Sequence, residues 1–197
     1  MFQSNNSVMA MDSVTTPAIA ASSRSQSITE KAWFNAIWFQ MTWCCAVLGR
    51  ETLLPLTAAM LVLHLTLVRD TTRELLQLTT LAAIGIVIDA GLSLAGVFRF
   101  PGGVLVPLWL CGLWLAFATA PGRSLSFLGR QPTLAVLAGA VVIPLNYWAG
   151  QRLGAVEFGY PVPVTLAIMS LVWAVMLPVL FRLTALIGSA SDSEELT

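Results

Sequence analysis

The sequence predicts an all-α integral membrane protein with six transmembrane helices. Of its 197 residues, 57% are hydrophobic and only 10% are charged, whereas a typical soluble domain carries about 25% charged residues. The mean hydropathy is +0.80. A water-soluble domain of this length lacks the interior volume to bury so much apolar surface, so the bilayer is the solvent that suits the chain. The net charge of zero leaves no basic surface of the kind that binds nucleic acid.

Six apolar blocks, separated by glycine, proline or charged residues, supply the predicted spans. They cover residues 32–49, 53–68, 75–97, 104–120, 132–149 and 163–187. A helix needs about 20 residues to cross the hydrocarbon core, with a range of about 17–25. The third and sixth blocks meet this length easily, whereas the second crosses only if it recruits neighbouring residues. Spanning β-strands are not favoured, because the blocks are too long and lack strict alternation.

The two ends of the chain differ from the blocks between them. The first residues are rich in Ser, Thr, Asn and Gln and contain no apolar run long enough for the core of a signal peptide. Residues 1–31 are therefore predicted to form a disordered polar tail. Residues 32–187 form the predicted six-helix transmembrane domain, and residues 188–197 form a short acidic tail.

The distribution of lysine and arginine predicts the orientation. Cytoplasmic loops of membrane proteins carry an excess of these residues. In the predicted topology, seven lie on one side and three on the other. The seven are Arg24, Lys31, Arg69, Arg73, Arg123, Arg130 and Arg182, and the three are Arg50, Arg99 and Arg152. Both termini are therefore predicted to be cytoplasmic.

One acidic residue, Asp89, lies well inside an apolar block. It falls toward the outer half of the third block, on one helical stripe with Gly85, Ser93 and Gly96. Small residues on such a stripe let another helix approach closely. Charged groups within a span are usually paired or functional. Two interpretations stay open: Asp89 pins two helices through a hydrogen bond or salt bridge, or it handles a proton or a substrate.

Further polar residues share the outer side with Asp89. The candidate residues for ligand binding or ion pairing are Asp89, Arg50, Arg99, Asn146, Tyr147, Arg152 and Gln40. Gln40 lies on the face of the first predicted helix that ends at Arg50. The outer arginines either pair with Asp89, Glu51 and Glu157, or they form an anion-binding pocket for a lipid headgroup or a carboxylate.

Catalytic and metal-binding motifs are missing from the sequence. The three cysteines, Cys44, Cys45 and Cys111, lie in apolar stretches, and His64 is the single histidine. No metal-ligand spacing, P-loop, Rossmann glycine pattern or Ser-His-Asp set can be assembled. The sequence predicts no cofactor, no metal, no catalytic residue and no enzymatic activity.

Several segments together resemble a bacterial family of small multi-pass inner-membrane proteins that carries only a domain-of-unknown-function label. They are WFNAIWFQ (33–40) with VLG (47–49), GIVID (85–89), FPG (100–102) leading to PLW (107–109), Leu113-Trp114 with Phe117, and PLNYWAGQRLGA (144–155). The resemblance covers residues 33–187. It implies a location in the bacterial inner membrane, no established activity, and an association with envelope lipid metabolism.

Three hypotheses for function follow from these observations. The first is a non-catalytic membrane protein that binds or handles a lipid or small amphiphile in its outer half. The second is a small transporter that uses Asp89 as a proton-coupling acid. The third is a scaffold or accessory subunit for an envelope-lipid enzyme. The expected partners are the lipid bilayer, a lipid or small amphiphile, and a membrane protein partner.

Overall fold

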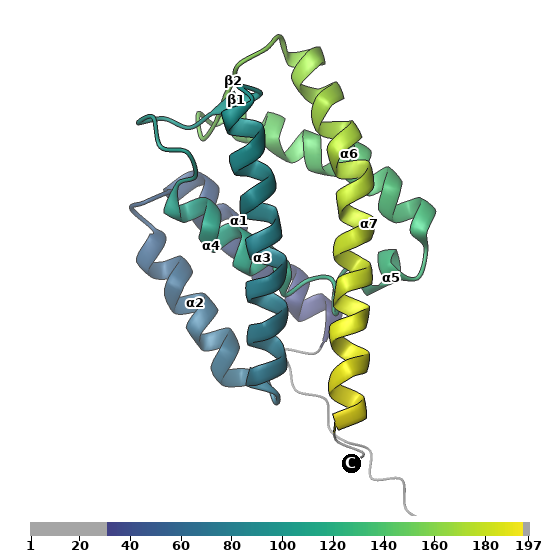
Figure 1. Cartoon of the computed structure of the whole chain (residues 1–197). Coiled ribbons are helices and arrows are strands. Elements are labelled where there is room, and N and C mark those ends of the chain that lie inside the picture. Colours follow the sequence, from purple (N-terminus) through teal and green to yellow (C-terminus); the bar gives the residue numbers. More distant parts are fainter. Residues whose placement is uncertain (1–30, 195–197) are drawn as a thin grey trace, which may run out of the picture.

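The computed structural model describes residues 31–194, with side chains described through residue 190. Apart from Lys31, the predicted N-terminal tail (1–31) lies outside the described residues. The described part is mostly helical, and its elements follow one another as α1 (Ala32–Gly49), α2 (Leu54–Leu67), α3 (Thr71–Leu94), β1 (Phe98–Arg99), α4 (Leu108–Ala118), α5 (Ser126–Gly129), α6 (Pro132–Arg152), β2 (Glu157–Phe158) and α7 (Val162–Glu194). Each of the six predicted blocks overlaps one helix, and α5 is a single turn that was not predicted (Figure 1).

Three helices are long and apolar enough to cross a membrane by length and composition: α3, α6 and the Val162–Ala190 part of α7. The helices α2 and α4 are apolar but shorter. At 1.5 Å per residue, the 11 residues of α4 extend about 16 Å. The predicted block 104–120 is thus helical only in its middle. A proline lies on each side of the helix: Pro107 precedes α4, and Pro121 follows it.

Two other helix ends differ from the predicted blocks. Asp70 accepts a hydrogen bond from the backbone nitrogen of Arg73 at 2.9 Å, which caps the first turn of α3. The helix therefore begins at Thr71, four residues before the predicted start of the third block, and includes Glu74. At the other end of the chain, α7 continues to Glu194, so part of the predicted acidic tail is helical.

The helices pack as two groups with a shared interior. In the first group, α4 contacts α1, α2 and α3, and α2 contacts α1 and α3. In the second group, α6 and α7 form an antiparallel hairpin. Contacts between α3 and α7 join the groups, and Figure 1 shows these two long helices side by side. The hairpin is tight because Gly139 of α6 lies against the backbone carbonyl of Trp173 in α7, where a Cβ atom would collide.

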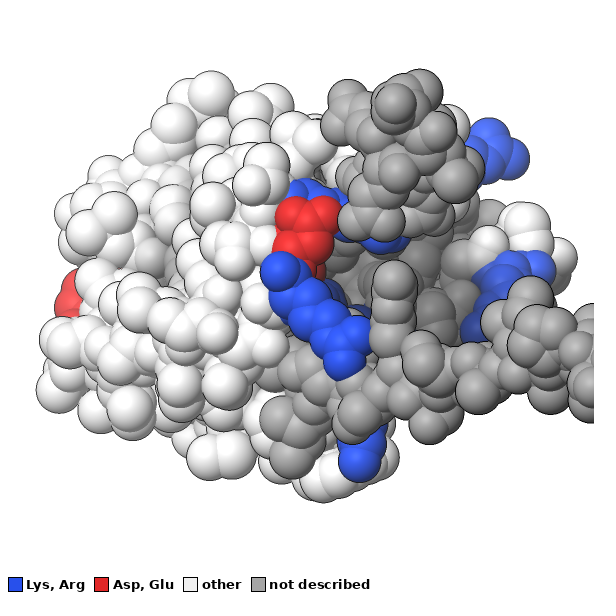
Figure 2. All heavy atoms as spheres, turned by 90° about the horizontal axis from the view of Figure 1, so that it is seen from below, with Lys and Arg blue, Asp and Glu red and all other residues white. Residues whose placement is uncertain are grey.

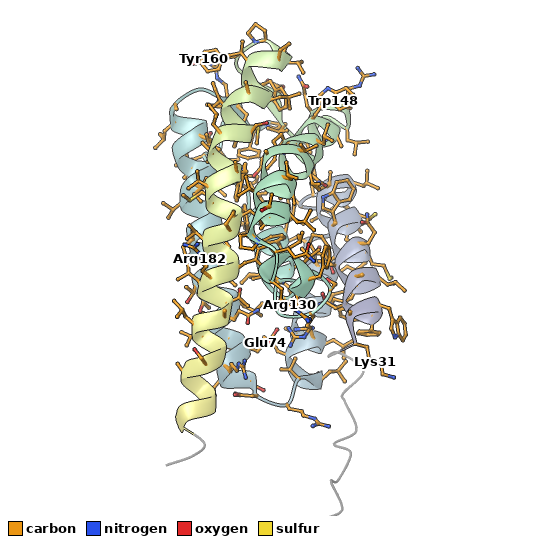
Figure 3. All side chains as sticks on the ribbon, turned by 90° about the vertical axis from the view of Figure 1, so that its right-hand side faces the viewer. Lys31, Glu74, Arg130, Trp148, Tyr160 and Arg182 are labelled. Atoms are coloured by element: carbon orange, nitrogen blue, oxygen red, sulfur yellow. The ribbon has the colours of Figure 1, made fainter. Side chains whose placement is uncertain are left out.

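The molecule has two distinct ends. Figure 3 places Lys31, Glu74 and Arg130 in the lower half, which we call the basic end, and Trp148 and Tyr160 in the upper half. The view from below in Figure 2 shows lysine and arginine side chains gathered on the lower face. At the upper end, β1 and β2 pair antiparallel, with Phe98 opposite Phe158 and Arg99 opposite Glu157. We call this the ladder end.

Candidate functional site

A cavity of about 420 Å³ lies between the two groups of helices. We call it the cleft. On one side its wall is a stripe of α1 formed by Phe39, Trp43 and Val47. On the other side it is a stripe of α6 that includes Val142 and Asn146. Each stripe repeats every four residues, the spacing that places side chains on one helical face.

Apolar side chains close the remaining sides of the cleft. The helix α4 forms the back wall with Trp109, Leu110, Leu113, Trp114 and Phe117. Leu125, Phe127 and Leu128 lie around α5, and Phe100, Ala155 and Val156 come from the ladder end. No lysine, arginine, aspartate or glutamate lines the cleft in the described part of the chain. Such a lining suits a hydrocarbon and disfavours a hydrated ion.

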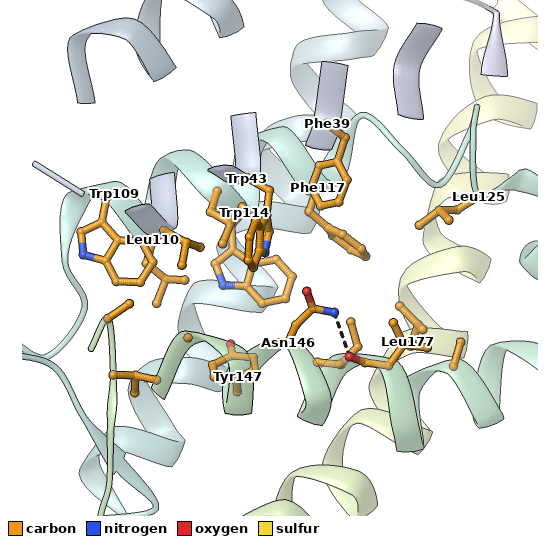
Figure 4. Close-up of a pocket in the computed structure, with 18 of the residues that line it drawn as sticks. Phe39, Trp43, Trp109, Leu110, Trp114, Phe117, Leu125, Asn146, Tyr147 and Leu177 are labelled. Atoms are coloured by element: carbon orange, nitrogen blue, oxygen red, sulfur yellow. Dashed lines mark hydrogen bonds between the residues drawn. The ribbon is translucent and has the colours of Figure 1, made fainter. Parts of the chain in front are cut away.

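Asn146 is the one side-chain amide in this lining. Its Nδ2 donates to the backbone oxygen of Val142 at 2.8 Å, one turn earlier in α6. Figure 4 shows the amide between α6 and the aromatic rings of α1 and α4. This bond uses one of the two N–H groups on Nδ2, so the second N–H and the carbonyl oxygen of Asn146 are available to a ligand.

Asp89 lies directly behind the cleft wall and is completely buried. One of its carboxylate oxygens accepts a hydrogen bond from Trp114 Nε1 at 2.7 Å, and the other accepts one from the Tyr147 hydroxyl at 2.5 Å. We call these three residues the Asp89 cluster. Both donors line the cleft, whereas Asp89 itself does not. The carboxylate therefore holds a side chain of α4 and a side chain of α6 in place from α3.

The Trp114 ring fits closely among its neighbours. It stacks on Trp173 of α7, with ring centroids 5.2 Å apart. It also lies against Gly85, where an added Cβ would collide with the indole. Gly85 is one turn before Asp89 on α3, so the small residue predicted on this stripe is the one that lets Trp114 reach the carboxylate.

A second buried carboxylate lies near the basic end. Glu74 accepts two hydrogen bonds from Arg123, at 3.0 Å to Oε1 and 2.7 Å to Oε2, in a bidentate arrangement. His64 Nε2 lies 2.7 Å from Oε1. We call Glu74, Arg123 and His64 the Glu74 cluster. Its ionic groups satisfy one another, in contrast to the Asp89 cluster, where both donors are neutral.

Side chains in and around the Glu74 cluster also donate hydrogen bonds to backbone carbonyls at the C-terminal end of α4. Gln77 donates to the backbone oxygen of Ala118 at 2.8 Å, and Arg123 donates to that of Thr119 at 3.1 Å. Asn35 of α1 donates to the Thr119 hydroxyl at 3.0 Å and to the Thr119 backbone oxygen at 3.4 Å. The last carbonyls of a helix have no partner within the helix. These contacts satisfy them where α4 stops, inside the protein rather than at its surface.

The other candidate residues from the sequence lie apart from one another. Arg50 Nη2 donates to the backbone oxygen of Leu153 at 2.8 Å, just beyond the end of α6. Arg99 lines a separate hollow together with Glu157. Arg152 is exposed. Gln40 is also exposed and contacts Cys44 Sγ at 3.7 Å, while Phe39 faces the cleft in its place.

The sequence interpretation missed both the Glu74 cluster and the aromatic lining. Glu74 lies one residue before the third predicted block and was not among the candidate residues. A capping aspartate four residues earlier, at position 70, was the available signal for the longer helix. Phe39, Trp43 and Val47 fall at four-residue spacing, but their partners come from distant helices, which spacing alone does not identify.

Comparisons with known proteins agree with the resemblance noted in the sequence. The model of a family described as "Protein of unknown function (DUF2878)" matches residues 32–179. The chain belongs to this family. Neither the curated proteins nor the solved structures contain a match. Among the described residues, no group of three or more His, Cys, Asp or Glu side chains is placed to hold a metal ion.

Proposed function

We propose that this protein binds the hydrocarbon chain of a lipid or small amphiphile in the cleft between α1 and α6. The main support is the character of the cleft, which has a volume of about 420 Å³ and is lined by apolar side chains on every side. Ligand pockets commonly fall between about 300 and 1,000 Å³ and present a few polar groups that orient the ligand. Asn146 supplies such a group on the α6 stripe, one turn before Gly150, the last α6 residue in the lining.

The surroundings of the cleft support access from the bilayer. Its two side walls, α1 and α6, make no extensive contact with each other. Residues on both carry exposed apolar side chains beside the lining, such as Met41 on α1 and Leu145 on α6. A hydrocarbon chain moving from the bilayer into such a cleft keeps its apolar surroundings throughout, so entry between these helices requires no passage through water.

The same proposal includes six membrane crossings with both termini in the cytoplasm. It is supported by the lysine and arginine side chains gathered at the basic end, which Figure 2 displays. It is also supported by the capped carbonyls at the end of α4, because non-helical backbone at membrane depth is tolerated only where it is buried in protein or lines a cavity. We take the bilayer to be a bacterial inner membrane, as the resemblance implies.

A fusion experiment tests this topology. Alkaline phosphatase and a fluorescent protein would be fused in turn after residue 197 and within residues 153–161. The proposal predicts fluorescence and no phosphatase activity for the C-terminal fusion, and the reverse for the loop fusion. Phosphatase activity at both positions would refute the orientation, since that enzyme is active only outside the cytoplasm.

Proton-coupled transport through Asp89 has less support. A transporter requires an aqueous route to its coupling acid. The cavity nearest Asp89 has no charged lining, and the rings of Trp114 and Tyr147 separate the carboxylate from it. No specific observation favours the scaffold hypothesis.

Lipid retention tests the proposed function. Ala138 is a small residue in the cleft lining, whereas Ala167 is an exposed alanine on α7. We would extract the wild type, A138F and A167F in a mild neutral detergent and count retained lipid by native mass spectrometry. Because a phenyl ring at position 138 fills part of the cleft, A138F should lose the lipid that the wild type and A167F retain. Equal retention by all three proteins would refute the proposal.

A further inference from the structure

Arg50 lies at the ladder end of the cleft, between the same two helices that form its side walls. It follows α1 directly, and the last α1 residue in the cleft lining, Val47, is one turn earlier. Its Nη2 donates to the backbone oxygen of Leu153, which is one turn after Gly150, the last α6 residue in the lining. The guanidinium therefore links the C-terminal ends of α1 and α6, one turn beyond the last residue of each helix that lines the cleft.

The backbone at Arg50 has an uncommon conformation. Its φ is 46°, and it is the one non-glycine residue with positive φ in the part of the chain that the structure describes. Long side chains rarely adopt positive φ, and glycine is the usual choice there. Residues held in such conformations cluster at ligand-binding and active sites. The backbone conformation at position 50 is therefore one that an arginine adopts at an energetic cost.

The guanidinium also has unmet hydrogen-bonding capacity. Its Nε is buried and has no hydrogen-bond partner among the described residues. Arginine carries five N–H donors and no acceptor, so a buried Nε–H requires an acceptor from elsewhere. No carboxylate in the described region lies within 4.0 Å of Arg50 to form an ion pair. Arg50 thus has no ion-pair partner among the described residues, and it lies one turn beyond the last α1 residue of the apolar cleft.

We propose that Arg50 binds the anionic headgroup of the molecule whose hydrocarbon chain occupies the cleft. The ligand class is an amphiphile with a carboxylate or phosphate group, because these oxyanions match the fork of guanidinium donors. The inference rests on the proposed function, since it assigns the headgroup of the same ligand. It also sets the ligand's direction, with the headgroup at the ladder end and the chain extending toward α5.

A competition experiment separates the headgroup from the chain. The purified protein in neutral detergent would be labelled with a photoreactive palmitic acid, in competition with palmitic acid, cetyl phosphate or cetyl alcohol. In the wild type, the two anionic competitors should reduce labelling at concentrations about tenfold lower than the alcohol, since a hydrogen bond to a charged group is worth about that factor. The better of the two anions identifies carboxylate or phosphate.

Variants of two arginines provide the control. In R50Q, the anions and the alcohol should reduce labelling at equal concentrations. R50K keeps the positive charge, so it should retain part of the preference for the anions. R152Q, at an exposed arginine near the same end, should behave as the wild type. Thermal unfolding of each variant monitors the hydrogen bond to Leu153. A purely structural Arg50 would weaken acid and alcohol alike in R50Q and leave their ratio unchanged.

The outcomes separate the two proposals. Binding of all three competitors with no preference for anions in the wild type would refute the headgroup site while leaving the chain-binding cleft intact. A preference for anions that survives R50Q would also refute it and would direct attention to another cation. Absence of competition by any amphiphile, including the alcohol, would overturn the proposed function and this inference together.

Discussion

Two buried carboxylates on the same helix have opposite kinds of partner. Glu74 and Asp89 both lie on α3, and their 15-residue separation corresponds to about 22 Å along the helix axis. Glu74 is held by the guanidinium of Arg123 and by His64. Asp89 is held only by an indole N–H and a phenol O–H, and it is completely buried.

The difference indicates what each cluster does. In the Glu74 cluster, fixed charges are matched and the neighbouring amides satisfy the end of α4, so its contribution is to the fold. In the Asp89 cluster, the carboxylate positions two side chains that line the cleft, so its contribution is to the geometry of that wall. The predictions below ask whether the two clusters separate in this way.

Removing the guanidinium from the Glu74 cluster should produce the largest effect. R123Q leaves the charge of Glu74 without its bidentate partner, and it should lower the free energy of unfolding by about 3–5 kcal/mol. Unfolding followed by circular dichroism in detergent measures this change. The double variant E74Q/R123Q should be less destabilised than R123Q, because it removes the unpaired charge as well. A double variant as unstable as the single one would contradict the ionic interpretation.

A methyl group added beside Asp89 should have a smaller effect on stability. G85A places a Cβ against the Trp114 ring, which must shift away from the carboxylate. Overpacking of this kind costs about 1–3 kcal/mol. The control is G91A on the same helix, where a Cβ meets nothing within 4 Å. Similar stabilities of G85A and G91A would mean that the indole is not tightly held.

The neutral replacement of Asp89 should change stability least. In D89N the amide oxygen can accept from Trp114, and the amide nitrogen can donate to the Tyr147 oxygen, so the loss should be about 1 kcal/mol. The same variant should reduce lipid retention in the native mass spectrometry assay, because Tyr147 loses its acceptor. A loss of stability as large as that of R123Q would remove the distinction between the two clusters.

The sequence predicted the helices more accurately than their lengths. The block 32–49 coincides with α1, since a charged residue lies at each boundary. The block 104–120 overestimated the length of α4, because hydropathy does not distinguish buried helical residues from buried non-helical ones. Two side chains that donate to backbone carbonyls at the end of α4, Gln77 and Asn35, lie on other helices. Only the packing brings them to the end of α4.

The sequence identified the central residue of the site but not its partners. Asp89 stood out because a charged residue in an apolar block is costly, and Gly85 on its stripe indicated a close approach. The identity of its partners did not follow, because Trp114 and Tyr147 are 25 and 58 residues away in the chain. Tyr147 was nevertheless among the candidate residues. Grouping all outer arginines with Asp89 depended on helix order, and the structure gives Asp89 two neutral donors instead.

The most direct test of the chain-binding cleft is the position of a photoreactive label. The wild-type protein in a bilayer would be irradiated with photoreactive palmitic acid, and the modified residues would be located by peptide mass spectrometry. We predict labels concentrated on the facing stripes of α1 and α6, at Phe39, Trp43, Val142 and Asn146. Labels spread evenly over outward-facing residues such as Leu94 and Leu171, with no excess on these stripes, would contradict the proposal.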